Sequence, residues 1–387
     1  MSDPIHLVIV AGTRPNFIKI APLMRTFEKV DDVRITLVHT GQHYDDKMSK
    51  AFFADLGIRE PDSNLDIGVG NLAQQTARII ERFDALLETL QPDGVIVVGD
   101  VTSTASAAWA TAHRHIPLFH VEAGLRSNDR GMPEELNRLV TDRLSDLLFC
   151  SEQSGVTNLR NEGTEENQVR FVGNVMIDTL LHFQEKAEAR GYWQNLKLPD
   201  NGYGLITLHR PSNVDDKATF RGLLDVLHSC GERLPLVWPM HPRARARLET
   251  FGWLEEIENS EHFHILPPLG YLDFINLLMH CRVALSDSGG LQEEATCLRK
   301  PILTLRHNTE RPSTCEYGGN QLVGTDPEKI YAAFRRVLDD PDFDCQAPPL
   351  WDGHTSERIL QHLRQFYEAR QNETGGADKL VESTPAR

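Results

Sequence analysis

The sequence has little of what marks nucleic-acid-binding, membrane-bound or exported proteins. Its 387 residues hold 40 lysines and arginines against 56 aspartates and glutamates, which gives a net charge of −16. This negative surplus disfavours sequence-independent binding to the phosphate backbone of nucleic acids. No apolar run approaches the length of a membrane span, and the first residues lack the zones of a signal peptide. We therefore expect a cytoplasmic protein that binds neither nucleic acid nor membranes.

The sequence also lacks the motifs of common metal and cofactor sites. Its six cysteines show no CxxC spacing, so we expect reduced thiols in the core. The sixteen histidines include no HExxH motif and no Cys/His cluster at metal-ligand spacing. Neither GxGxxG nor GxxxxGK[ST] occurs, so neither a dinucleotide cofactor nor a Walker-type ATP site is indicated. The sequence predicts no metal site and no cofactor.

What the sequence does contain is a regular alternation of apolar and amphipathic segments. Nearly continuous runs of Val, Ile and Leu, separated by helical stretches, indicate parallel sheets covered on both faces. A helix is expected over 72–90, where apolar residues recur at helical spacing. The predicted strands are 5–11, 34–39, 94–100, 117–124, 146–150, 169–173, 203–209, 235–239, 263–266, 282–287, 301–306 and 321–324.

The alternation stops at a polar stretch around 188–202 and then restarts. We therefore expect an α/β protein with two Rossmann-like, doubly wound domains that face a cleft. Residues 1–175 would form the N-terminal domain and residues 176–354 the C-terminal domain. A helix over 355–370 would pack back on the N-terminal domain, and the polar residues 371–387 would form a disordered tail.

Unusual polar residues follow the predicted strands, where open parallel sheets bind their ligands. These positions include Arg14, Lys19, Asp100, Glu122, Glu134, His209, Ser288 and Arg311. For Asp100 or Ser288 alone, the simpler interpretation is a helix N-cap. The recurrence of such residues over both halves of the chain favours one shared site.

The stretch "DSGGLQEEA" at 287–295 suits a diphosphate. Gly289 and Gly290 allow a sharp turn and a close approach of the backbone, and the free N–H groups of the following helix attract anions. Glu294 could accept hydrogen bonds from two ribose hydroxyls, and its alternative role is a solvated carboxylate on the helix surface. The positive charge for a pyrophosphate would come from Arg14, Lys19, His209 and Arg311.

Three carboxylates, Asp100, Glu122 and Glu134, would face the cleft from the N-terminal domain. Clustered carboxylates can have their pKa values pushed apart, which yields separate acid and base roles. The alternative is a structural role in salt bridges, and the nearby partners are Arg126, Arg130 and Arg138.

These residues lie in compound motifs that resemble the non-hydrolysing UDP-N-acetylglucosamine 2-epimerases. The motifs are "GTRPNFIKIAPL", "TGQHYD", "VVGDVTSTASAA", "HVEAGLRS", "MPEELNRLVTDRLSDLLF", "VGNVMIDTL", "LHRPSN", "GYLDF", "LSDSGGLQEEA" and "NTERP". They run in the family's order from about residue 5 to residue 370. The resemblance implies a glycosyltransferase-B-type fold, a homodimer, and interconversion of UDP-GlcNAc and UDP-ManNAc without NAD or a catalytic metal.

The resemblance also assigns roles to individual residues. The catalytic set would be Asp100, Glu122, Glu134 and His209. The substrate-binding set would be Arg14 and Lys19, Phe274 near the uracil, Ser288, Gly289 and Gly290 on the phosphates, Glu294 on the ribose, and Arg311. Gln42 and His43 match part of a second, allosteric UDP-GlcNAc site, whose second glutamine is replaced by Asp45. The chain also reads "HRPSN" where many members read "HRREN", and its segment between Glu122 and Glu134 is shorter than the common version.

The expected reaction is anti elimination of UDP to 2-acetamidoglucal, followed by re-addition with protonation of C2 from the other face. We expect Asp100 and Glu134 to serve the two faces, Glu122 to bind or tune, and His209 to contact the leaving phosphate. Several alternatives remain open at this point. The substrate could be a modified UDP-sugar, such as a 2,3-diacetamido sugar or a uronate, or the glycal could be released as in hydrolysing relatives. A retaining glycosyltransferase and a non-catalytic nucleotide-sugar sensor are the other candidates.

Overall fold

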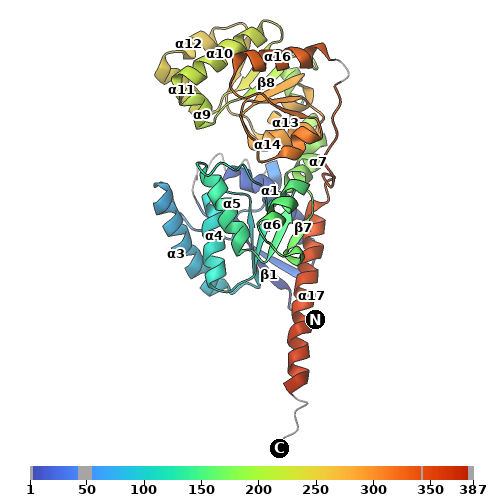
Figure 1. Ribbon diagram of the computed structural model, residues 1–387. Coiled ribbons are helices and arrows are strands. Elements are labelled where there is room, and N and C mark those ends of the chain that lie inside the picture. The colour runs from blue at the N-terminus through green and yellow to red at the C-terminus, as the bar shows by residue number, and fades with distance from the viewer. Residues whose placement is uncertain (1–2, 42–54, 341–342, 382–387) are drawn as a thin grey trace, which may run out of the picture.

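The computed structural model describes residues 3–41, 55–340 and 343–381. Figure 1 shows two lobes, one above the other, each built around a sheet that is flanked by helices. Continuous apolar runs form the central strands of each sheet, and nearly all of their side chains are buried, whereas strands at or near the sheet edges are partly exposed. This burial on both faces is what parallel sheets require.

The first lobe contains a sheet with the strand order β3-β2-β1-β4-β5-β6-β7, in which every pairing is parallel. Its strands are β1 (Ile5–Ala11), β2 (Val33–His39), β3 (Ser63–Asn64), β4 (Gly94–Val98), β5 (Leu118–Val121), β6 (Leu147–Cys150) and β7 (Val169–Phe171). The helical segments between them are α1 (Arg14–Phe27), α3 (Leu72–Leu90), α4 (Thr102–His113), α5 (Pro133–Leu144), α6 (Gln153–Asn161) and the 3₁₀ turn η1 (Glu166–Gln168).

The second lobe contains a sheet with the order β10-β9-β8-β11-β12-β13, and its pairings are parallel too. Its strands are β8 (Gly204–Thr207), β9 (Leu236–Pro239), β10 (Phe263–Leu266), β11 (Val283–Ser286), β12 (Ile302–Thr304) and β13 (Asn320–Leu322). Its helices are α9 (Pro211–Val214), α10 (Lys217–Gly231), α11 (Pro242–Phe251), α12 (Leu254–Glu258), α13 (Tyr271–His280), α14 (Gly289–Cys297), α15 (Pro312–Glu316) and α16 (Pro327–Asp339). The predicted architecture of two doubly wound sheets is confirmed.

One strand, β3, has no counterpart in the sequence-based prediction. It consists of two polar residues that pair with Val38 and His39 of β2. A two-residue polar segment carries no alternation of apolar and polar side chains, so only its tertiary pairing defines it as a strand.

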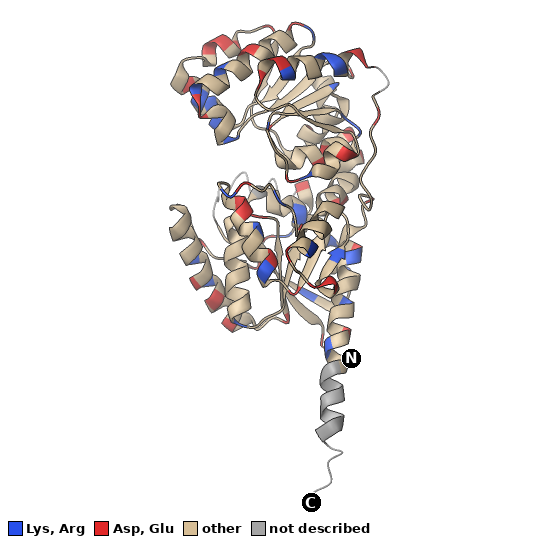
Figure 2. Ribbon diagram, in the orientation of Figure 1, with Lys and Arg blue, Asp and Glu red and all other residues tan. Residues whose placement is uncertain are grey.

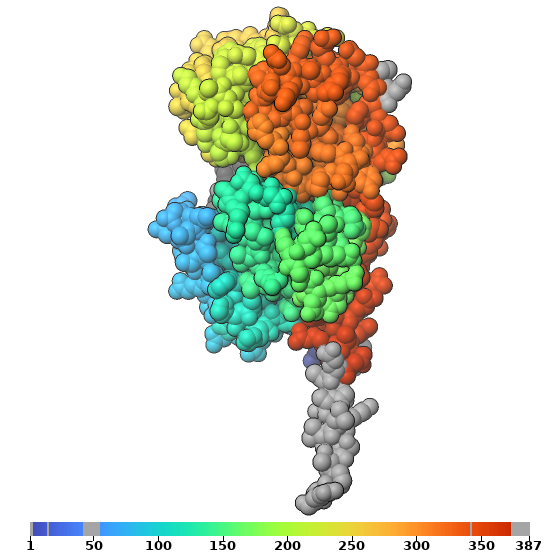
Figure 3. All heavy atoms as spheres, in the orientation of Figure 1, coloured from blue at the N-terminus to red at the C-terminus, as the bar shows by residue number. Residues whose placement is uncertain are grey.

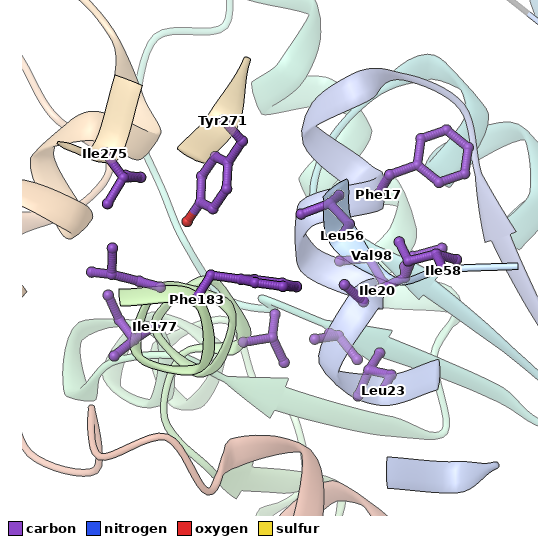
Figure 4. Packing of buried hydrophobic residues seen from close by; sticks show 14 of the residues in the cluster. Phe17, Ile20, Leu23, Leu56, Ile58, Val98, Ile177, Phe183, Tyr271 and Ile275 are labelled. Carbon is purple, nitrogen blue, oxygen red and sulfur yellow. The ribbon is translucent and has the colours of Figure 1, made fainter. Parts of the chain in front are cut away.

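Helix α7 (Val175–Glu188) lies between the lobes and packs on both. In Figure 4, Phe183 of α7 lies between Tyr271 of α13 and Ile20 of α1, and Ile177 of α7 lies below Ile275 of α13. These side chains belong to one continuous buried cluster that draws residues from both sheets. The domain boundary expected at 175/176 therefore falls at the start of a helix that both lobes share. The short helix α8 (Tyr192–Asn195) follows it.

The last helix, α17 (Thr355–Val381), packs on the first lobe. Arg364 binds Asp32 with contacts of 2.7 Å, and the Tyr367 hydroxyl donates to the Asp93 carbonyl at 2.9 Å. The predicted end of this helix at residue 370, with a disordered tail from residue 371, was wrong, because the helix continues to Val381. A helix that is already nucleated by packing extends at little cost even through polar residues. Residues 382–387 lie outside the described residues.

Charged residues lie along the outer helices of the second lobe, α10, α11, α12 and α16 (Figure 2). Within the part of the chain that the structure describes, none of the helices combines the length and apolarity needed to cross a bilayer. The six cysteines are all free, and four of them are buried.

Candidate active site

The strand orders place a ligand crevice in each lobe. In the first lobe the strands before β4 are added on one side of β1, and β4 and later strands on the other side. In the second lobe the same reversal of strand order falls between β8 and β11. Ligands of open α/β sheets bind beyond the carboxyl ends of the strands at such points. Lys19 and Asp100 follow β1 and β4, and His209 and Ser288 follow β8 and β11.

A cavity of about 480 Å³ lies between these four strand ends. The predicted site residues that line it are Lys19, Asp100, Glu134, His209, Phe274, Ser288, Gly289, Gly290, Glu294 and Arg311. Glu122 is not in the cavity wall and lies behind it, against Lys19 and Arg311. The side chain of Arg14 and the residues Gln42 and His43 lie outside the part of the chain that can be described. Among the described residues, no group of three or more His, Cys, Asp or Glu side chains is placed to hold a metal ion.

Two carboxylates reach the cavity from the first lobe. Asp100 follows β4, remains about a quarter exposed (24%) and accepts a hydrogen bond from Arg138. Glu134 lies in the first turn of α5 and is half-buried. Arg138, one turn further along α5, also holds Glu135 at 2.7 Å, so it fixes the helix against Asp100. The alternative of a salt bridge to Arg138 is thus realised for Asp100, which nevertheless stays open to the cavity.

Glu122 stands in an unusual backbone conformation, with φ of 72°. A non-glycine residue in this left-handed region is uncommon and often marks a functional position. Its Oε2 accepts from the Lys19 ammonium, and its Oε1 accepts from Arg311 Nη2 at 2.8 Å. Burial by itself raises the pKa of Glu122, but Lys19 and Arg311 outweigh it and hold this pKa below its usual range. Glu122 is therefore a fixed anion.

His209 is oriented by a buried aspartate. Its Nδ1 lies 2.9 Å from Asp287 Oδ1, and the backbone N–H groups of His209 and Arg210 donate to the same carboxylate. Burial tends to raise the pKa of Asp287, but His209 and the backbone N–H groups of His209 and Arg210 together outweigh burial and lower this pKa. An ionised Asp287 accepts the proton on Nδ1, which leaves Nε2 as the nitrogen that can meet a ligand.

The second lobe contributes a helix N-terminus and a buried carboxyl. Ser288 occupies the N-cap position of α14, but its side chain makes no capping hydrogen bond. The N–H groups of Gly289 and Gly290 begin the helix at the cavity wall, where they can bind an anion. Glu294 is only 5% exposed, so the alternative of a solvated surface carboxylate was wrong. Burial, opposed in part by the Tyr271 hydroxyl, raises the pKa of Glu294 to about 8.

Several cavity residues were not predicted as part of the site. They are Arg138, Arg210, His241, Tyr271 and Glu310. Two carried a usable signal. Arg138 follows Glu134 by four residues in "PEELNR", which places both on one helix face. Arg210 adjoins His209 in "LHRPSN" and lies at the same strand end.

The family model for UDP-N-acetylglucosamine 2-epimerase matches residues 25–364. This chain belongs to the UDP-N-acetylglucosamine 2-epimerase family. It is 38% identical over 362 residues to the UDP-N-acetylglucosamine 2-epimerase of Methanocaldococcus jannaschii, covering 92% of this chain and 98% of that protein. It is 36% identical over 363 residues to the UDP-2,3-diacetamido-2,3-dideoxy-D-glucuronate 2-epimerase of Pseudomonas aeruginosa, covering 93% and 99%.

Solved structures of this epimerase family have the same fold. The M. jannaschii UDP-GlcNAc 2-epimerase in complex with UDP-GlcNAc and UDP superposes with a TM-score of 0.87 at 37% identity, covering 93% of this chain and all (100%) of that chain. The Neisseria meningitidis UDP-GlcNAc 2-epimerase bound to UDP-GlcNAc gives 0.86 at 30% identity, with coverage of 93% and 100%. The sucrose-phosphate synthase of Thermosynechococcus elongatus, at 12% identity and a TM-score of 0.63, shares the fold alone. The predicted glycosyltransferase-B-type fold and epimerase class are confirmed.

Proposed function

We propose that this epimerase inverts C2 of a UDP-N-acetylhexosamine and interconverts UDP-GlcNAc and UDP-ManNAc. The observation that carries the proposal is one cavity with two chemically distinct walls. The first lobe supplies two carboxylates, Asp100 and Glu134. The second lobe supplies the N-terminus of α14 and the buried Glu294. A glycosyltransferase needs a nucleotide wall and an acceptor, but it has no use for a carboxylate pair opposite the nucleotide.

The pair is needed because the C2 proton of the sugar is adjacent to no carbonyl. One carboxylate removes this proton while the C1–O bond breaks, which leaves 2-acetamidoglucal and UDP in the cavity. UDP then re-adds to C1 while the other carboxylate returns a proton to C2 on the opposite face. Asp100 and Glu134 serve these two faces. Elimination and re-addition cause no net oxidation or reduction, so the proposal requires no nicotinamide and no metal.

The departing diphosphate needs positive charge and hydrogen-bond donors in place before the bond breaks. We assign this role to the N–H groups that follow Ser288, together with Lys19, Arg14 and the Nε2 of His209. Glu294 accepts the ribose hydroxyls, and Phe274 lies beside the uracil. The presence of Ser288 and His209 in the same cavity wall, with His209 bound to the residue before Ser288, supports this assignment.

A second candidate substrate is a UDP-2,3-diacetamido uronic acid, the substrate class in the name of the P. aeruginosa relative. One observation favours it. Arg210 lines the cavity, and its Nη2 is 3.9 Å from the nearest carboxylate oxygen, that of Glu310. A guanidinium held at this distance can bind a carboxylate on C6 of the sugar.

We also propose that the epimerase works as a homodimer. Three large apolar side chains, Trp109 of α4 and Leu136 and Val140 of α5, are between 41% and 46% exposed. The two helices pack side by side, and we take these exposed side chains on the first lobe as the apolar surface that contacts the second copy.

The proposed function is tested by incubating the enzyme with UDP-GlcNAc in deuterated water and following the products by proton NMR. Breaking the C2–H bond and returning a solvent-exchanged proton must give UDP-ManNAc with deuterium at C2. An oxygen label between C1 and phosphorus must also scramble among that phosphate's oxygens, because UDP leaves and returns. Turnover only of a 2,3-diacetamido uronic analogue, with C2 deuteration, identifies the second candidate. Hydrolysis with C2 still protonated, or binding without reaction, refutes the epimerase proposal.

A further inference from the structure

A chain of buried charges crosses from one lobe to the other beneath the cavity. Lys19 of α1 binds Glu122, and Glu122 binds Arg311, the residue before α15 in the second lobe. The three residues are 7%, 5% and 5% exposed. Figure 3 shows the second-lobe residues, in orange, in direct contact with first-lobe residues, in green, and α15 packs on α6 at this junction. This series of ion pairs therefore exists only while the two lobes are in contact.

The guanidinium of Arg311 is fully engaged by protein carboxylates. Its Nη2 donates to Glu122 Oε1 at 2.8 Å, and its Nη1 donates to Glu310 Oε1 at 2.6 Å. Its Nε lies 2.8 Å from Glu293 Oε1. Each nitrogen of the fork that would grip a phosphate thus already faces a protein carboxylate. This differs from the substrate-binding role that the family resemblance assigns to Arg311.

The two carboxylates behind Arg311 are themselves held in place. Glu310 accepts from Arg306 Nη2 at 2.8 Å, and Glu293 accepts from Asn174 Nδ2 at 2.8 Å. Asn174 caps α7, the helix that both lobes share. Arg311 is consequently held by residues of the second lobe and, through Glu293 and Asn174, by the shared helix. Its Nη2 is the nitrogen that contacts Glu122.

Gly289 makes room for this anchor. A Cβ atom at this position would lie 2.9 Å from both Arg311 Nη1 and Glu310 Oε1. The double glycine therefore has a packing function beneath the cavity in addition to its place at the helix N-terminus. Gly289 thus both lines the cavity and leaves room for the Arg311 side chain behind it.

We propose that Arg311 is a positioning residue: it joins the lobes and fixes Glu122, so that Glu122 and Lys19 reach their working arrangement only when the lobes meet. This inference rests on the proposed function. Glu122 has both oxygens bound, and Lys19, which it holds, reaches the cavity wall. Separation of the lobes removes Arg311 from Glu122 and leaves this carboxylate held by Lys19 alone.

The test separates positioning from nucleotide binding. Arg311→Lys keeps one charge but cannot bridge three carboxylates. We expect kcat to fall at least tenfold, while the Kd for UDP changes less than threefold. Loss of UDP affinity with kcat retained would identify a nucleotide ligand and overturn the proposal, and so would unchanged values of both. Arg114→Lys is the matched control, since Arg114, just after the end of α4 and outside the cavity lining, binds Asp84 with two nitrogens, and its change should leave both values unaltered.

A second variant tests the proposal if Arg311→Lys does not fold properly. Glu293→Gln is isosteric and loosens Arg311 from behind without touching Glu122. It should lower kcat about threefold to tenfold, with UDP affinity kept, and unchanged kcat would overturn the proposal. The acid limb of the kcat profile is a further readout. Arg311→Gln should move this limb to higher pH, because Glu122 loses a cation, and Arg311→Lys should largely restore it.

A measurement without turnover distinguishes this inference from the proposed function. Small-angle scattering of the UDP complex should give a larger radius of gyration for Arg311→Gln than for the parent protein. If the parent fails to epimerise any UDP-sugar, the proposed function fails, and the scattering and UDP affinities still decide whether Arg311 joins the lobes. An unchanged radius of gyration in Arg311→Gln refutes the joining role.

Discussion

Glu122 and Arg311 form a buried ion pair, with 2.8 Å between Oε1 and Nη2, across 189 positions of sequence. Glu122 belongs to the first lobe and Arg311 to the second, so the pair connects the two lobes whose residues line the cavity. Removing one partner of such a pair leaves a buried charge without compensation. The catalytic residues are therefore best probed with variants that leave this pair intact.

Asp100→Asn and Glu134→Gln each remove one member of the carboxylate pair in the cavity. We expect each change to lower kcat by about a hundredfold or more, the scale of lost acid–base catalysis. UDP affinity should persist, because neither residue is among those proposed to contact the diphosphate or the ribose. Steady-state kinetics and calorimetric titration with UDP measure the two quantities. Glu261→Gln, an exposed carboxylate outside the cavity, is the control, and near-parental turnover of both cavity variants would show that the pair is misassigned.

UDP affinity should depend on pH through Glu294. Its pKa is raised to about 8 by burial, and the ribose hydroxyls bind best to the ionised form. Binding should therefore release a proton, and affinity should rise about eightfold from about pH 7 to about pH 8.5 as the ionised fraction grows. Calorimetry in buffers of different ionisation enthalpy reports the proton. Glu294→Gln should bind more weakly and without this pH dependence, whereas a parent protein with flat affinity would contradict the ribose assignment.

Glu294 should also make stability fall as pH rises from about 4.5 to about 8. Its pKa is about 8 in the folded protein, above the ordinary value of 4.5 expected in the unfolded chain. The folded state therefore has the full benefit of the neutral carboxyl below about pH 4.5 and loses it as pH rises through about 8. Glu294→Gln should raise the melting temperature by a few degrees at about pH 9 and by nothing at about pH 4.5. Calorimetric scans of both proteins at both pH values test this, and an equal difference at the two would refute it.

The apolar surface on α4 and α5 predicts the assembly. Trp109→Glu combined with Leu136→Glu should convert the dimer into a monomer, because each charge would enter the contact unpaired. Light scattering after size-exclusion chromatography measures the mass. Leu322→Glu, an exposed apolar position on the second lobe, should leave the dimer intact. A monomeric parent protein, or a dimer that survives the double change, would contradict the proposed interface.

Sequence patterns predicted the sheets accurately because a parallel strand that is buried on both faces needs consecutive apolar residues, and such a run is visible in the sequence. The run at 5–11 and the periodicity at 72–90 match β1 and α3 residue for residue. Strand ends gather at one edge of a parallel sheet, so the residues after them could be assigned to one site. The same reasoning did not predict β3, because its two polar residues form a strand only by pairing with β2.

The sequence by itself determined the two α/β lobes, the helix N-terminus at Gly289 and the set of polar residues at the strand ends, because each follows from short-range pattern and parallel-sheet geometry. Tertiary structure alone decided which charges meet. Glu294 is buried and its pKa is raised, Glu122 lies behind the cavity wall, and Arg311 pairs with Glu122 while it also lines the cavity. The reason is physical: burial and ion pairing depend on distances between lobes, which no local sequence pattern encodes.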